Sequence, residues 1–238
     1  AVDIEPFYEN DRVIGLAEMM NSFGVNQADP AILDKINVTL EHQKIIDGHA
    51  PLLSGQELNG YVAAGIRSDH ECSNVREAKE KFARGQWIMV REGTAAHNLE
   101  ALLPLFEAPY AQRIMLVTDD KHPCDLLRDG HIDAIVRKAV QKGIDPVKAI
   151  KAGTYNAASY FGLVNHGAIA PGYCADIAVL DSLTELNVLE VYKDGVLAAE
   201  NGKSLVKSSV PEMGQEIQER VYHSFHVDPV NVSQLAME

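Results

Sequence analysis

Five apolar runs recur along the first half of the chain, and each of them ends in polar residues. They are RVIGLAE (12–18), QKIIDGH (43–49), AAGIRSDHE (63–71), QWIMVRE (86–92) and RIMLVTDD (113–120). Stretches of helical character separate the runs, which follow one another at intervals of about 20 to 30 residues. This alternation predicts parallel βα units. Because the runs are apolar throughout rather than alternating, we expect strands that are covered on both faces.

The stretches between the runs carry signals for the start and end of helices. We expect helices over residues 30–43, 54–64, 73–85 and 94–107. Ser54 and Glu57 have the spacing of a capping box, in which the two side chains bind free backbone N–H groups at the helix start. Ser73 or Asn74 is expected to cap the third helix, and Gly85 is expected to end it.

The number of βα units bears on the fold class. Five units make up about five-eighths of a (β/α)8 barrel, and a complete barrel needs about 250 residues. An open, doubly wound α/β sheet is the alternative. The polar residues at the end of every strand favour the barrel, because the active site of a barrel collects at the carboxyl ends of its strands.

Beyond residue 120 the pattern changes. Helical sequence follows, with a new helix starting at Asp145 and Pro146, and short β-branched runs with Gly and Asp turns then indicate a small β domain. We expect residues 1–166 to belong to the barrel and 167–204 to the small β domain. Residues 205–238 are expected to form a linker and the start of a further domain.

Charge and cysteine content narrow the function classes. The 238 residues carry a formal net charge of -13, which disfavours nucleic acid or an anionic membrane as the main partner. No apolar run approaches the roughly 20 residues that a membrane span requires. Three widely spaced cysteines indicate reduced thiols in a cytoplasmic protein rather than a disulfide framework. The chain begins at Ala1 in sequence that reads as the middle of a domain, so we expect a fragment of something longer.

Four residues with metal-binding side chains stand at the ends of four separate expected strands. They are Glu18, His49, His70 and Asp119. Imidazole nitrogen and carboxylate oxygen together suit zinc, manganese or iron in the divalent state. Two such ions can lower the pKa of a shared water towards about 7. Each residue also has a structural interpretation: a hydrogen-bonded histidine, a solvated glutamate, or an aspartate at a helix N-cap.

The same strand ends carry a resemblance to a known family. The order Glu, His, His, Asp and the tail TYNAASYFGLVNHGAIAPGYCADIAVLD resemble the amidohydrolase superfamily. The segments IGLAEMMN, DGHAPLLSG, AGIRSDHECS, MVREGTAAHN and VTDDKHPCDLLRDGHID closely resemble the bacterial adenine deaminase family. The resemblance covers nearly all of residues 11–200. It implies a partial (β/α)8 TIM-type barrel, strands four to eight, followed by a small β domain.

The resemblance also implies roles for the matched residues. Glu18 would be a bridging carboxylate, and His49 and His70 would bind the second metal. Asp119 would bind the first metal and shuttle a proton. Glu71 is a candidate for a hydrogen bond to a purine nitrogen or for proton transfer, with a supporting role for His70 as the alternative. Candidates for substrate contact are Arg91, Glu92, His122 and Asp120, although Asp120 could equally cap a helix.

One element of the superfamily pattern is missing. Its first strand supplies a His-x-His pair, and no such pair precedes Glu18. We therefore expect an internal fragment that lacks the first barrel strands and forms a homo-oligomer or associates with the missing barrel half.

The activity that the resemblance implies is hydrolytic deamination of adenine to hypoxanthine and ammonia. It would use two divalent metal ions, manganese or iron, with zinc as an alternative. The absence of any C-x-x-C motif excludes the small zinc deaminase fold. Two alternatives stay open. One is another amidohydrolase activity, on a cyclic amide or a different aminopurine, and the other is a catalytically incomplete fragment or structural subunit.

Overall fold

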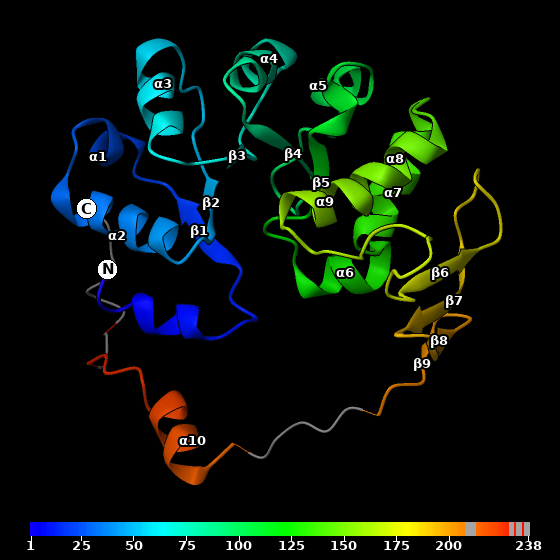
Figure 1. The fold of residues 1–238 in the computed structure, drawn as a ribbon. Helices are drawn as coiled ribbons and strands as arrows, with labels where there is room; N and C mark the ends of the chain where they lie inside the picture. Colours follow the sequence, from blue (N-terminus) through cyan, green and yellow to red (C-terminus); the bar gives the residue numbers. More distant parts are fainter. Residues whose placement is uncertain (208–212, 229–230, 232–234, 236–238) are drawn as a thin grey trace. The chain divides into compact units, whose positions relative to one another are not determined.

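The computed structural model describes residues 1–207, 213–228, 231 and 235 (Figure 1). The chain divides into two compact units, Ala1–Ser204 and Leu205–Glu238. The first unit holds all the strands of the described residues. The described part of the second unit contains one element of regular secondary structure, helix α10 (Gln215–Tyr222).

Five parallel strands form the centre of the first unit (Figure 1). They are β1 (Gly15–Met19), β2 (Ile45–Gly48), β3 (Ser68–Asp69), β4 (Trp87–Arg91) and β5 (Ile114–Val117). The five expected strands and their parallel pairing are confirmed. They lie in two ladders, β1-β2 and β3-β4-β5, and do not close into a barrel. The backbone amide of Arg67, immediately before β3, donates a hydrogen bond of 3.0 Å to the carbonyl of Ile46 in β2. This bond connects the two ladders.

Helices connect the strands and cover one side of them. These are α1 (Ser22–Asn26), α2 (Pro30–Glu41), α3 (Gly55–Ala63), α4 (Val75–Ala83) and α5 (Leu99–Leu102), with 3-10 turns at Glu5–Glu9, Leu103–Phe106 and Tyr110–Gln112. Asn74 caps α4 as expected, because its side chain accepts a hydrogen bond from the Glu77 amide.

Two local predictions are wrong. Ser54 precedes α3 but makes no side-chain cap hydrogen bond, and the Gly55 amide donates instead to Glu80 on the neighbouring helix. The expected helix over 94–107 is shorter: residues 94–98 are not helical, with His97 in an isolated antiparallel bridge to Glu92, and α5 passes into a 3-10 turn at Leu103. Pro104 lacks the backbone N–H that an α-helix would need there.

The strands bury side chains on both faces. Ile88, Val90, Ile114 and Leu116 pack with residues of the surrounding helices in the largest core cluster. The intervening Met89 and Met115 point the other way and pack against Tyr160. Alternate side chains of a strand point to opposite faces, so an apolar run is what a strand covered on both faces requires.

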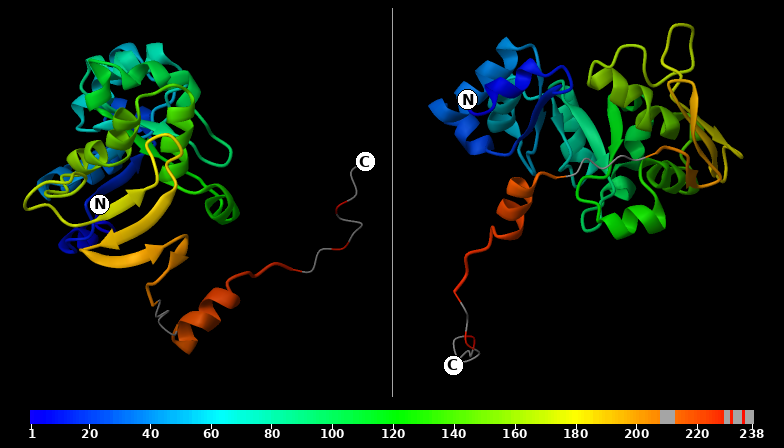
Figure 2. Two further views of the ribbon diagram at one scale, coloured as in Figure 1. Left: turned by 90° about the vertical axis from the view of Figure 1, so that its right-hand side faces the viewer. Right: turned by 90° about the horizontal axis from the view of Figure 1, so that it is seen from below.

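The remainder of the first unit is helical and then antiparallel (Figure 2). The helices are α6 (Pro123–Asp129), α7 (Ile132–Gln141), α8 (Pro146–Gly153) and α9 (Tyr155–Tyr160). Asp145 caps α8 by accepting hydrogen bonds from two backbone amides, as its Asp-Pro sequence predicts. The strands β6 (Ile177–Leu180), β7 (Val188–Lys193), β8 (Val196–Glu200) and β9 (Lys203–Ser204) then form one antiparallel sheet. Among the described residues, no helix has the length and apolar character to cross a membrane.

Candidate metal centre

Three predicted metal ligands converge at the carboxyl ends of β1, β2 and β3. The Nε2 atom of His70 lies 2.9 Å from a Glu18 carboxylate oxygen and 3.2 Å from Nδ1 of His49. The Nδ1 atom of His49 lies 3.4 Å from the same Glu18 oxygen. The His70 side chain is only 9% exposed, whereas His49 is half-buried and Glu18 is exposed. Side chains from three strands therefore share one small volume.

The local backbone explains why these side chains meet. The register between β1 and β2 shifts after Leu16, so that Ala17 and Glu18 stand opposite the single residue Asp47. Such a bulge turns the following side chains relative to a regular strand. At Gly48 the strands approach so closely that a Cβ atom would lie 2.2 Å from the Ser68 carbonyl oxygen, and only glycine fits immediately before His49.

A tyrosine from α3 joins the ends of the first two strands. The buried hydroxyl of Tyr61 donates a hydrogen bond to the Met19 carbonyl and accepts one from the His49 amide at 2.9 Å. Burial raises the pKa of this hydroxyl, so it stays protonated and remains able to donate a hydrogen bond. Tyr61 thus fixes the backbone beside both Glu18 and His49.

A second group adjoins the first at the ends of β3, β4 and β5. Arg91 donates hydrogen bonds to both carboxylate oxygens of Glu71 and, at 2.6 Å, to Asp119. The Oε1 atom of Glu71 lies 3.4 Å from Nε2 of His70, which links the two groups. Asp119 has a φ of 51°, in the left-handed region that aspartate tolerates better than most residues.

The chemistry of the donors fits a divalent metal at the first group. Glu18, His49 and His70 offer one oxygen and two nitrogen atoms that all lie within 4.8 Å of one another. This donor set suits zinc, manganese or iron. The ligand atoms of His70, Glu71 and Asp119 also lie within 4.8 Å of one another, but the Arg91 guanidinium already supplies positive charge to both carboxylates. The fit is therefore better at Glu18, His49 and His70.

Three other sequence candidates are not brought to these groups. Glu92 is buried, and its carboxylate accepts hydrogen bonds from the Leu99 amide and from Lys138 on α7. His122 is exposed, and its Nδ1 atom accepts a hydrogen bond from the Cys124 amide at the start of α6. Asp120 is also exposed, and it belongs to none of the candidate metal groups of the described residues.

Sequence reasoning missed two supporting residues. Asn98 donates to the carbonyls of His70 and Cys72 and accepts from the Arg91 amide at 2.6 Å, so it ties the end of β3 to the end of β4. Lys81 on α4 is fully buried beside Asp69 and Glu77. The signal for Lys81 was its helical position: it lies between Ala78 and Phe82, on the face that the apolar residues assign to the core.

The stability of the protein should depend on pH through Glu77. Burial alone would raise the pKa of Glu77, but hydrogen bonds from Lys81 and two backbone amides hold it below its ordinary value of 4.5. A carboxyl whose pKa is lowered by folding stabilises the protein above its unfolded pKa, and this contribution is lost as the pH falls through the folded pKa. We expect the melting temperature to decrease below a pH of about 4.5. In the Glu77→Gln variant the decrease should be smaller, and parallel curves for the two proteins would contradict this assignment.

Known proteins resemble this chain in sequence. The model of the amidohydrolase family matches residues 2–198. A protein named adenine deaminase from Desulfatibacillum aliphaticivorans is 49% identical over 203 residues, which are 85% of this chain and 36% of that protein. Another, from Dehalococcoides mccartyi, is 46% identical over 99% of this chain and 40% of its own length. The chain thus spans well under half of the length of these curated relatives.

Solved structures show the same fold at lower identity. A β-aspartyl dipeptidase from Fervidobacterium islandicum aligns with a TM-score of 0.64 at 18% identity, over 83% of this chain and 61% of that one. Molinate hydrolase aligns with a TM-score of 0.60 at 18% identity, over 90% of this chain and 57% of its own. With its family model matched over most of its length, this chain belongs to the amidohydrolase family and is similar to adenine deaminases.

Proposed function

We propose that the protein catalyses the hydrolytic deamination of adenine to hypoxanthine and ammonia. The observation that carries the proposal is the convergence of Glu18, His49 and His70 beside Glu71 and Asp119 at the strand ends. The relatives named adenine deaminases, which are 46% and 49% identical to this chain, support the choice of substrate.

The proposal extends to the architecture of the whole protein. In it, β1 to β5 are strands four to eight of a (β/α)8 barrel, within a barrel segment of residues 1–166. Residues 167–204 belong to a small β domain, and 205–238 lead into a further domain. Because the chain spans only 36–40% of its curated relatives, the first strands would come from outside these residues.

Glu18, His49 and His70 would hold a divalent ion, manganese or iron, with zinc as the alternative. Asp119 would contribute to a second metal ion. When bound, such ions polarise water and stabilise developing negative charge. The burial of His70 and the half-buried position of His49 favour this chemistry, because electrostatic interactions strengthen as water is excluded.

The side chains around the ligands would move protons and orient the substrate. Asp119 would accept a proton from the attacking water and deliver it to the departing amine, since a carboxylate can serve as base and then as acid. Overall, the water oxygen becomes bonded to C6, the bond from C6 to the exocyclic nitrogen breaks, and ammonia leaves with one water proton, while the other water proton ends on ring nitrogen N1 of hypoxanthine. Glu71 would hydrogen-bond a ring nitrogen of the purine. Arg91 would hold Glu71 and Asp119 at their present spacing, because it donates to both.

Ammonia release tests the proposal. The protein would be loaded with manganese and offered adenine, guanine, cytosine and a hydantoin under the same conditions. We expect ammonia from adenine and little from the others. Turnover of the hydantoin or guanine instead would identify another amidohydrolase activity. No turnover of any compound by protein that holds its metal would contradict the proposed function.

A further inference from the structure

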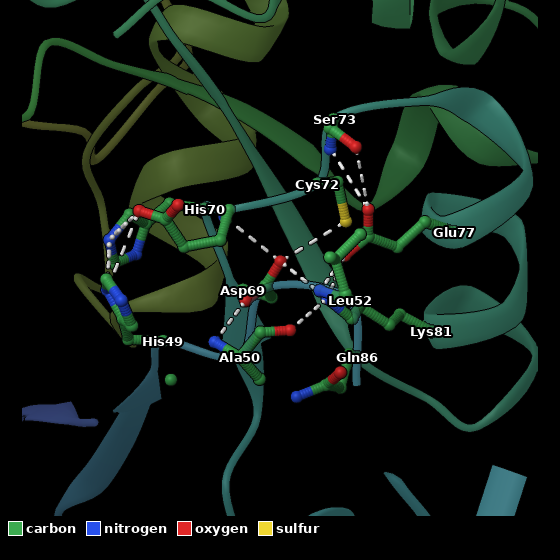
Figure 3. A network of polar contacts seen from close by, with 12 residues as sticks. His49, Ala50, Leu52, Asp69, His70, Cys72, Ser73, Glu77, Lys81 and Gln86 are labelled. Carbon is green, nitrogen blue, oxygen red and sulfur yellow. Dashed lines mark hydrogen bonds and ion pairs between the residues drawn. The ribbon is translucent and has the colours of Figure 1, made fainter. Parts of the chain in front are cut away.

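A lysine on α4 is completely buried behind the candidate metal centre (Figure 3). The Nζ atom of Lys81 donates to the Ala50 carbonyl at 2.6 Å, to Asp69 at 3.0 Å and to Glu77 at 2.8 Å. All three donor positions of the ammonium group are thus used. Ala50 directly follows His49, and Asp69 directly precedes His70. One cation therefore binds the chain beside both imidazoles.

Asp69 extends this connection to the two loops that carry the imidazoles. Its side chain accepts hydrogen bonds from the Ala50 amide at 2.8 Å and from the Glu71 amide at 3.0 Å. The other end of the network is fixed by Glu77, which accepts from the amides of Leu52 and Ser73. The loops after β2 and β3 are consequently joined through one buried set of charges.

The buried charges of Lys81, Asp69 and Glu77 stabilise one another. Asp69, Cys72 and Glu77 lie close enough together to resemble a metal site, but the Lys81 ammonium occupies the space between the two carboxylates. Burial would lower the pKa of Lys81, but the attraction of Asp69 and the hydrogen bonds to Glu77 and Asp69 together outweigh this and raise it, so the group stays charged. A buried ion left without its partner is strongly unfavourable. The position of Lys81 thus restricts both loops to one arrangement.

We propose that Lys81 is a positioning residue of the metal centre, which holds the His49 and His70 loops together so that both imidazoles face Glu18. The inference that a metal binds there rests on the proposed function, whereas the ordering of the two loops does not. The consequence is a loss of metal affinity when Lys81 is replaced, even though Lys81 touches neither imidazole.

The test compares three forms of residues 1–238: the unchanged chain, Lys81→Met, and a matched control, Lys138→Met. Methionine keeps the length of the side chain and removes the charge. Lys138 also pairs with a buried carboxylate, that of Glu92 at 2.6 Å, and among the hydrogen bonds of the described residues it donates to neither histidine loop. Amide hydrogen exchange of the metal-free proteins and calorimetric titration with manganese would be measured for each form.

In Lys81→Met we expect the Ala50 and Glu71 amides to exchange at least about tenfold faster, and manganese to bind about 10- to 100-fold more weakly, the range typical of groups that orient metal ligands. Both quantities should stay within twofold of the unchanged chain in Lys138→Met. A folded Lys81→Met protein with unchanged exchange and unchanged affinity would overturn the proposal. Equal changes in exchange and affinity in Lys81→Met and Lys138→Met would also overturn it. Such changes would come from a loss of global stability rather than from the positioning of the two loops.

A second variant covers the case in which Lys81→Met does not fold. Glu77→Gln combined with Lys81→Met removes one negative and one positive charge, so the net charge of the buried network is unchanged. The double variant still lacks the contacts of Lys81 with Ala50 and Asp69, and we expect the same changes in exchange and affinity. If the unchanged chain binds no manganese, the proposed function fails on that result, and the exchange rates alone decide the role of Lys81.

Discussion

Replacing His70 by alanine should weaken the binding of a divalent metal by at least about 100-fold. Loss of a residue that merely orients a metal ligand typically costs 10- to 100-fold in affinity, and loss of the ligand itself should cost more. His70 belongs to both groups of candidate ligands and lies within 3.4 Å of Glu18, His49 and Glu71. Because its side chain is only 9% exposed, solvent has little room to replace it.

Calorimetric titration with manganese and zinc would measure this effect. The matched control is His166→Ala, since the half-buried His166 ring hydrogen-bonds the Val164 carbonyl and belongs to none of the candidate metal groups of the described residues. We expect the control to bind metal as the unchanged protein does. Equal affinity of the His70→Ala protein would show that the cluster is not a metal centre.

Replacing Asp119 by asparagine should slow ammonia release from adenine by about 10²- to 10⁴-fold, the range that a general acid-base group contributes. Asparagine has nearly the same shape and can still accept a hydrogen bond from Arg91, which lies 2.6 Å from Asp119. It cannot take up and return a proton. The loss should therefore fall mainly on kcat if Asp119 moves a proton in the rate-limiting step.

Steady-state kinetics with metal saturating would test this second expectation. Asp129→Asn is the matched control, because Asp129 is an exposed aspartate on α6 that pairs with Arg128. Its kcat should stay within twofold of the original value. A kcat for Asp119→Asn that is also within twofold would remove Asp119 from the proton-transfer step.

Glu18, His49, His70 and Asp119 could be placed from the sequence because of one topological rule. Parallel strands put their carboxyl ends at the same edge, so residues that follow separate apolar runs are brought together. The strands and their parallel pairing follow from the same runs. Glu18, His49 and His70 meet as this rule requires. Asp119 lies beside them in contact with Arg91.

The direction of neighbouring side chains was harder to predict. Arg91 and Glu92 are consecutive, yet Arg91 turns to Glu71 while Glu92 turns to Lys138 on α7. Successive residues of a strand point to opposite faces, but the sequence does not show which of the two faces the site. The apolar face of α4 directs Lys81 toward the core, but its partners Asp69 and the Ala50 carbonyl are 12 and 31 residues away. A local pattern contains no information on such distant contacts, and a lysine in a helix ordinarily lies in solvent.

X-ray absorption spectroscopy of the zinc-loaded chain tests the metal centre most directly. If Glu18, His49 and His70 hold the ion, the spectrum should contain two imidazole nitrogens at about 2.0–2.1 Å together with carboxylate oxygen. The imidazole scattering should disappear in a variant in which both His49 and His70 are replaced by alanine. A spectrum with oxygen ligands alone, or one that the double replacement leaves unchanged, would contradict the account.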